Sequence, residues 1–182
     1  MTDLKSPAAS EWELRLRAIL PFFGHRNWIV VADAAYPAQS KPGIETILAG
    51  EKAIRVVQKV MDAIKVCGHI CAKIYTDSEL SFVAEQDAPG VTKYRRRLNA
   101  ALAGSMITQI PHEQIIARLD QAAQVFRILV IKTELTIPYT SVFFELDCGY
   151  WNAEAEARLR QAIASADARA GAPALMEATH EK

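Results

Sequence analysis

The chain of 182 residues has no long apolar run, no excess of one charge and few cysteines. No apolar run approaches the roughly 20 residues that a membrane-spanning helix needs. Basic and acidic residues each number 21, so the formal net charge is zero, which argues against a nucleic-acid partner and an acidic tail. Three cysteines fit a reducing compartment better than a disulfide scaffold. Residues 1–7 contain no apolar signal core, so we expect a cytoplasmic protein without a membrane partner.

Several motifs of cofactor binding and catalysis are also missing. There is no Gly-x-Gly-x-x-Gly, no phosphate loop and no Gly-x-Ser-x-Gly, so nucleotide cofactors and acyl-enzyme chemistry lack support. Cys67, His69 and Cys71 alternate, and on a strand they would share one face. A zinc site needs a fourth ligand and usually Cys-x-x-Cys spacing, so we favour small core residues over the alternative of metal ligands. We therefore expect neither a metal nor a cofactor.

Apolar periodicity predicts helices and strands that alternate along the chain. The predicted helices cover residues 11–23, 54–64, 91–103, 112–124 and 153–170. The predicted strands cover residues 28–32, 70–75, 106–110, 126–131 and 141–146. Such alternation is typical of an α/β sheet covered on both faces, and the continuous apolar run at 28–32 is typical of a parallel sheet. We expect one domain over residues 1–150, followed over 151–182 by a surface helix and, from residue 171, a frayed tail.

A histidine and an aspartate flank the first predicted strand. His25 precedes residues 28–32 and Asp33 follows them. A carboxylate that ends an apolar strand must be hydrogen-bonded or paired, because burying it alone costs several kcal/mol. An imidazole that faces such a carboxylate is the minimum apparatus for moving protons on a small polar ligand. The alternatives are a solvated loop histidine and a helix-capping aspartate.

Further polar residues lie near the ends of later predicted elements. Thr133, Tyr139 and Ser141 lie between the last two predicted strands of the domain. A phenol offers both a donor and an acceptor to a ligand hydroxyl, although Tyr139 could also be a packed aromatic at a strand start. His112 follows Pro111 at a predicted helix start, where it is either a ligand contact or an exposed first-turn histidine.

These segments resemble the D-ribose pyranase and L-fucose mutarotase (RbsD/FucU) family over about residues 16–149. His25 and Asp33 match its Gly-His-x-Asp … Asp-Ala-x-x-Pro signature, and Thr133 and Tyr139 match its later Thr…Tyr-x-Asn segment. The resemblance implies a three-layer α/β/α sandwich, here with a C-terminal helical extension. It also implies toroidal homo-oligomers, often decamers, with sites where subunits meet. The implied activity is cofactor-free interconversion of the anomers or ring forms of a free monosaccharide.

The resemblance also assigns roles to single residues. His25 is the implied general acid–base catalyst. The implied sugar contacts are Asp33, His112, Tyr139 and Ser141. Two positions depart from the family pattern, since Asn27 replaces an acidic residue and Ser141 replaces an asparagine. These departures favour either a different sugar or the alternative function, a non-catalytic sugar-binding or regulatory protein. The C-terminal extension could cap or block an oligomer contact.

Overall fold

The computed structural model describes residues 9–170. The expectations for residues 1–7 and for the tail from residue 171 lie outside the described residues. Residue contacts divide the chain into two compact units, Met1–Gly149 and Tyr150–Lys182. The second unit contributes one described helix, α5 (Ala153–Ala170), whose described side chains are exposed or half-buried. None of the described helices is both long enough and apolar enough to cross a membrane.

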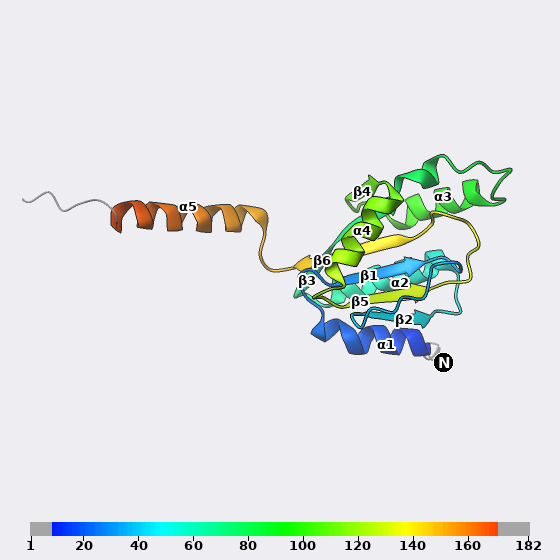
Figure 1. Cartoon of the computed structure of the whole chain (residues 1–182), viewed down its shortest axis with the longest axis horizontal. Helices are drawn as coiled ribbons and strands as arrows, with labels where there is room; N and C mark the ends of the chain where they lie inside the picture. The colour runs from blue at the N-terminus through cyan, green and yellow to red at the C-terminus, as the bar shows by residue number, and fades with distance from the viewer. Residues whose placement is uncertain (1–8, 171–182) are drawn as a thin grey trace, which may run out of the picture. The chain divides into compact units, whose positions relative to one another are not determined.

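The first unit contains a six-stranded sheet in the order β2-β5-β1-β6-β3-β4 (Figure 1). The strands are β1 (Trp28–Ala32), β2 (Ile44–Leu48), β3 (Ile70–Asp77), β4 (Ile107–Ile110), β5 (Ile128–Lys132) and β6 (Val142–Cys148). Val30 of β1 pairs in parallel with Val130 of β5 and in antiparallel fashion with Phe143 of β6. The predicted α/β class is confirmed, but the prediction that β1 belongs to a parallel sheet is only half right, because β6 runs opposite to its neighbours.

Helices cover both faces of this sheet, which confirms the three-layer α/β/α architecture. The helical elements are α1 (Glu11–Ile19), η1 (Leu20–Phe22), α2 (Ala53–Val66), η2 (Ser78–Ser81), α3 (Val91–Ala101) and α4 (His112–Ala122). Helices α1, α2 and α3 share one hydrophobic cluster with the sheet, and α4 packs in a second cluster on the other face. The edge strand β2 is not predicted by the apolar pattern, because its exposed Thr46 and Leu48 interrupt any buried run.

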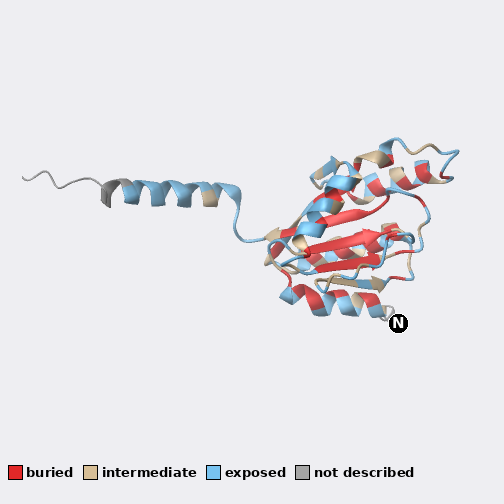
Figure 2. Ribbon diagram, in the orientation of Figure 1, coloured by how far each residue is buried: buried red, intermediate tan, exposed pale blue. Residues whose placement is uncertain are grey.

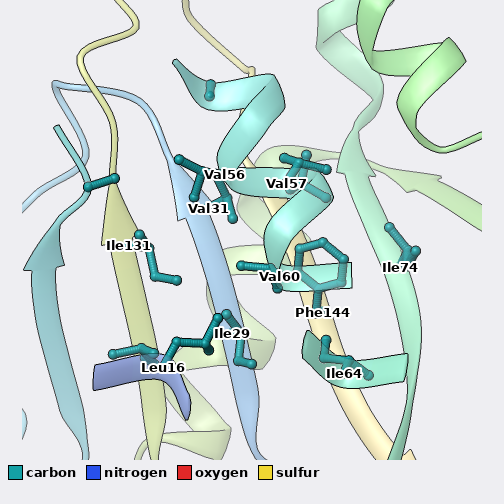
Figure 3. Close-up of a cluster of buried hydrophobic side chains, with 14 of the residues drawn as sticks. Leu16, Ile29, Val31, Val56, Val57, Val60, Ile64, Ile74, Ile131 and Phe144 are labelled. Atoms are coloured by element: carbon teal, nitrogen blue, oxygen red, sulfur yellow. The ribbon is translucent and has the colours of Figure 1, made fainter. Parts of the chain in front are cut away.

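The core depends on the alternation of side chains along β1. Ile29 and Val31 point to the α2 face, and Val30 points to the α4 face. On the α2 face, Val56 and Val60 are completely buried, Val56 near Val31 of β1 and Val60 near Phe144 of β6 (Figure 3). Each such aliphatic side chain contributes about 1.5–3 kcal/mol to stability. Burial on both faces explains why β1 is apolar throughout and β5 is apolar as far as Ile131 (Figure 2).

The strand directions bring several polar segments to one end of the sheet. Strands β1, β3, β4 and β5 end there and β6 begins there, since Val31 and Thr76 both pair with Val142. We call this end the carboxyl edge, and the opposite end, where β1 begins and β6 ends, the amino edge. Ligands of open α/β sheets bind outside the carboxyl ends of the strands. The carboxyl edge is therefore the place to look for a site.

Candidate functional site

A histidine–aspartate pair lies at the carboxyl edge. Nδ1 of His112 lies 3.0 Å from Oδ1 of Asp77, the last residue of β3. Because an ionised carboxylate only accepts hydrogen bonds, we assign the Nδ1 proton to His112 as donor. The side chain of Asp77 is 0% exposed and that of His112 is 30% exposed. The Nδ1 side of the imidazole is therefore engaged by Asp77, while the side chain as a whole stays partly exposed.

The surroundings of Asp77 disfavour its charged form. Burial raises the pKa of Asp77 from 3.8 to about 6, against the opposing effect of the His112 hydrogen bond. The negative charges of Glu79 and Asp33 raise this pKa further. Oδ2 of Asp77 is buried without a hydrogen-bond partner. A buried carboxyl group that is only half satisfied destabilises the fold, and such groups are concentrated at functional sites.

Glu79 of η2 fixes the position of His112. The backbone N–H of His112 donates to both carboxylate oxygens of Glu79, at 2.9 and 3.1 Å. Pro111, at the N-cap of α4, has no side-chain oxygen to cap the helix, so Glu79 supplies the negative charge there instead. The ring of Tyr139 meets the His112 ring edge-on, with centroids 5.6 Å apart and an interplanar angle of 81°. The imidazole is thus held by a carboxylate, a helix cap and an aromatic neighbour.

Asp33 lies in a turn directly after β1. Its Oδ1 accepts the backbone N–H of Ala35 at 2.8 Å, so Asp33 caps a turn and not a helix. The next residue, Ala34, donates its backbone N–H to the carbonyl oxygen of Leu135 at 2.8 Å. The hydroxyl of Thr133 donates to the carbonyl oxygen of Ala32 at 2.9 Å. These bonds fasten the segment after β5 to the end of β1, beside Asp33.

The same segment presents Tyr139 and buries Ser141. Tyr139 has a φ of 58°, in the left-handed region, and is 39% exposed. The neighbouring Thr140 is anchored, because its carbonyl oxygen accepts the Tyr94 hydroxyl at 2.8 Å. Ser141 is only 2% exposed, so its hydroxyl offers a ligand little surface. Of Tyr139, Thr140 and Ser141, only Tyr139 is exposed.

His25 lies at the amino edge, away from these residues. Strand β1 separates His25 from Asp33, and its five residues at about 3.3 Å each place the two roughly 15 Å or more apart. Within one chain His25 therefore lies apart from Asp33, and the imidazole that packs against Tyr139 is His112. That His25, Asp33 and Tyr139 share a site where subunits meet stays a prediction. Because β1 lies between His25 and Asp33 in the sequence, its length sets the distance between them.

His25 has its own charged neighbours. Its Nδ1 lies 2.6 Å from Oδ1 of Asp147, whose Oδ2 pairs with Lys73 at 2.6 Å. The Lys73 ammonium lowers the pKa of Asp147 to about 2, with a smaller contribution from His25. The side chain of His25 is 56% exposed. His25 is thus an accessible imidazole next to a carboxylate that stays ionised near neutral pH.

The Cys67, His69 and Cys71 set does not form a common face. Cys67 ends helix α2, and β3 begins only at Ile70. The ring nitrogens of His69 lie 2.6 and 3.1 Å from the carbonyl oxygens of Cys67 and Phe23. Within residues 9–170, no group of three or more His, Cys, Asp or Glu side chains is arranged to hold a metal ion.

Comparisons with known proteins identify the family. A family model described as the RbsD / FucU transport protein family matches residues 13–148. The chain belongs to this family. The structure of Bacillus subtilis RbsD complexed with D-ribose is 17% identical, with a TM-score of 0.54 over 84% of this chain and 100% of that chain. FucU from Bifidobacterium longum is 15% identical, with a TM-score of 0.50 over 74% of this chain and 92% of that chain. These two likenesses show the shared fold. A search of curated proteins found no match.

Asn27 replaces an acidic residue of the RbsD/FucU pattern, and its side chain forms two hydrogen bonds. Its Oδ1 accepts the backbone N–H of Gly24 at 2.8 Å, and its Nδ2 donates to the carbonyl oxygen of Arg127 at 3.1 Å. Asn27 therefore holds the turn that carries His25. The carboxylate beside that imidazole is Asp147, from the end of β6.

Asp77 and Glu79 are site residues that sequence reasoning misses. The predicted strand over residues 70–75 ends two residues too early and leaves Asp77 outside it. A signal is nevertheless present, because Asp77 is a carboxylate at the end of a strand, close in position to Asp33 directly after β1. Glu79 carries no comparable signal, since its role depends on the approach of α4 from a distant part of the chain.

Proposed function

We propose that this chain interconverts the anomers or ring forms of a free monosaccharide without a cofactor. The proposal is supported above all by the His112–Asp77 pair, which lies beside Tyr139 and within the electrostatic reach of Asp33. Carboxylates, an imidazole and a phenol together supply the donors and acceptors that sugar hydroxyls need. Membership of the RbsD/FucU family and the D-ribose in the B. subtilis relative favour an aldose as the substrate.

The reaction requires two proton transfers. Ring opening needs a proton on the ring oxygen and the loss of the proton from the anomeric hydroxyl, and ring closure reverses both steps. A positioned acid–base group accelerates such a step by about 10²- to 10⁴-fold. In this proposal Asp33, His112 and Tyr139 hold the sugar hydroxyls, while Ser141 contributes at most a marginal contact because it is buried. Asp77 keeps the Nδ1 proton of His112 in place and so directs Nε2 toward the sugar.

His25 is the proposed general acid–base catalyst, supplied by a second copy of the chain. It is exposed at the amino edge and hydrogen-bonded to the ionised Asp147. An imidazole can donate and accept a proton near neutral pH, which suits a reaction that runs in both directions. This assignment requires a homo-oligomer in which the amino edge of one copy faces the carboxyl edge of another.

A second candidate function is sugar binding without turnover. The burial of Ser141 favours it, because the residue at this position then holds the sugar less firmly than the asparagine of the family pattern. This candidate predicts that a sugar raises the melting temperature while its anomers exchange at the rate seen in buffer.

Saturation-transfer NMR on D-ribose tests the proposal. The wild-type chain should exchange the ring forms faster than buffer, and His112→Gln should remove most of the gain. Gln114→Ala, an exposed change in the same first turn of α4, serves as the matched control and should leave the rate unchanged. Thermal stabilisation without faster exchange would support the binding function instead. Absence of both effects would contradict D-ribose as a ligand of this site.

A further inference from the structure

A cavity lies between α2, α3 and the segment after β5. Its volume is about 770 Å³, and Asp33, Asp77, His112 and Tyr139 do not line it. Its walls come from the first turns of α2, from one side of α3 and from residues 134–137. Tyr94 connects the cavity to the carboxyl edge, since its ring lines the cavity and its hydroxyl donates to Thr140.

The cavity combines apolar walls with a cationic rim. The larger apolar side chains that line it are Ile54, Leu135 and Ile137. Four exposed cations also line it: Lys52, Arg55, Lys93 and Arg97. The lining includes two carboxylates, Glu51 and Glu134, so its formal charge is +4 − 2 = +2, in a chain whose formal net charge is zero. A cluster of this kind attracts an anion that also has an apolar body.

Glu51 does little to neutralise this rim. Its carboxylate is occupied by Lys59, at 2.7 and 2.9 Å, and by the indole N–H of Trp12, at 3.1 Å. Arg55 lies farther from Glu51, with Nε 3.7 Å from Oε2. Lys52, Lys93 and Arg97 form no salt bridge with a described residue. The positive charge of the rim therefore remains available to a ligand.

Two of the cations occupy positions that disfavour the isolated helix. Lys52 is the N-cap of α2 and Arg55 lies in its first turn, where positive charge opposes the helix dipole. Helix α2 has neither a side-chain cap nor an acidic residue in its first turn. By contrast, Glu85 accepts the backbone N–H groups of Gly90 and Thr92 at the start of α3. In water alone, Lys52 and Arg55 would destabilise the start of α2 through the helix dipole. An anion bound beside them would offset that destabilisation.

We propose that this cavity binds a small organic phosphate monoester. The charge of the ester, about −1.5 to −2 near neutral pH, matches the formal charge of the lining. The cationic rim holds the phosphate, and the organic body lies against Ile54, Leu135 and Ile137. This inference stands independently of the proposed monosaccharide function, because the two sites share no proposed ligand contact.

Isothermal titration calorimetry on the full chain at fixed ionic strength tests the proposal. Phenyl phosphate is the probe, with inorganic phosphate and phenol as its charged and apolar halves. The variant Lys52→Gln/Arg97→Gln removes one rim cation from each helix. The matched control Lys65→Gln/Arg96→Gln removes exposed cations from the same two helices outside the cavity. Urea midpoints of all proteins establish that each variant folds.

Phenyl phosphate should bind saturably, and inorganic phosphate and phenol should each bind about tenfold more weakly or not at all. The cavity variant should weaken phenyl phosphate binding about tenfold or more, and the control should match the wild type. The proposal is overturned if phenyl phosphate does not bind, or if inorganic phosphate binds equally well, which would indicate an adventitious ion only. Equal binding by the cavity variant and the wild type would overturn it as well.

Discussion

The Nδ1 nitrogen of His112 lies 3.0 Å from a carboxylate oxygen of Asp77 that has no exposed surface. Their pairing joins the end of β3 to the start of α4, and Asp33 and Tyr139 complete the surroundings. The site therefore depends on the buried Asp77 carboxyl group, whose effect on the stability of the fold varies with pH.

Replacement of Asp77 by Asn should change how stability depends on pH. Because the folded-state pKa of Asp77 is about 6 and the ordinary value is 3.8, the folded state binds more protons than the unfolded state between these values. The contribution of Asp77 to stability is therefore full below its ordinary pKa and is lost as the pH rises through about 6. Relative to Asp77→Asn, the wild type should lose up to about 3 kcal/mol between about pH 4 and pH 7.5. Urea unfolding at the two pH values measures this difference. If the stability difference between the wild type and Asp77→Asn stayed constant over this range, Asp77 would titrate normally. The control is Asp62→Asn, on the exposed side of α2.

Removal of the Glu79 carboxylate should destabilise the start of α4. Glu79→Ala leaves the His112 N–H without its carboxylate acceptor, which should lower the free energy of unfolding by about 0.5–2 kcal/mol. Glu79→Gln keeps one acceptor oxygen and should cost less. Equilibrium urea unfolding provides the values. The control is Glu113→Ala, which removes an exposed carboxylate from the first turn of the same helix and so loses only its interaction with the helix dipole. If Glu79→Ala were no more destabilising than Glu113→Ala, Glu79 would act through its charge alone and would not cap the helix.

Tyr94→Phe should loosen the segment that presents Tyr139. Tyr94 is 6% exposed, and its hydroxyl is the donor to the buried Thr140 carbonyl. Loss of this donor should lower the free energy of unfolding by about 1–3 kcal/mol, because a buried acceptor is left without its partner. Chemical denaturation measures the effect, and Tyr150→Phe, at an exposed position, should have almost none. A Tyr94→Phe protein as stable as the wild type would mean that water replaces the hydroxyl.

A mixing experiment tests whether His25 serves a neighbouring copy. His25→Ala and Asp33→Asn should each lack D-ribose exchange activity when purified alone. If the site forms between copies, oligomers reassembled from an equal mixture should recover about one quarter of wild-type activity, since about one interface in four combines both intact residues. No recovery after proven subunit exchange would contradict a site in which His25 of one copy serves Asp33 of another.

The sequence predicts most elements of the fold because their apolar patterns are long. The first strand is predicted at its observed bounds, Trp28–Ala32, since burial on both faces makes it continuously apolar. The edge strand β2 is not predicted, because its side chains are partly exposed and leave no clear apolar pattern in the sequence. Helix α4 is predicted from its start at His112, where Pro111 marks the boundary.

The candidate site is only partly predictable, because its arrangement depends on the order of strands in the sheet. Asp33 and Tyr139 do lie at one edge, where the end of β1 and the start of β6 meet. The placement of His25 at the other edge follows from the length of β1, which can be read from the sequence once that strand is assigned. The pairing of Asp77 with His112 requires β3 and β4 to be neighbours, and no local pattern reports this.

The rate at which D-ribose exchanges its ring forms, measured by saturation-transfer NMR with Asp33→Asn beside the wild type, tests the central claim most directly. The exposed Asp87→Asn is the control for the loss of one negative charge. We predict that the wild type and Asp87→Asn exceed the rate in buffer and that folded Asp33→Asn returns to it. An Asp33→Asn protein as fast as the wild type would contradict the assignment of a sugar site to the carboxyl edge.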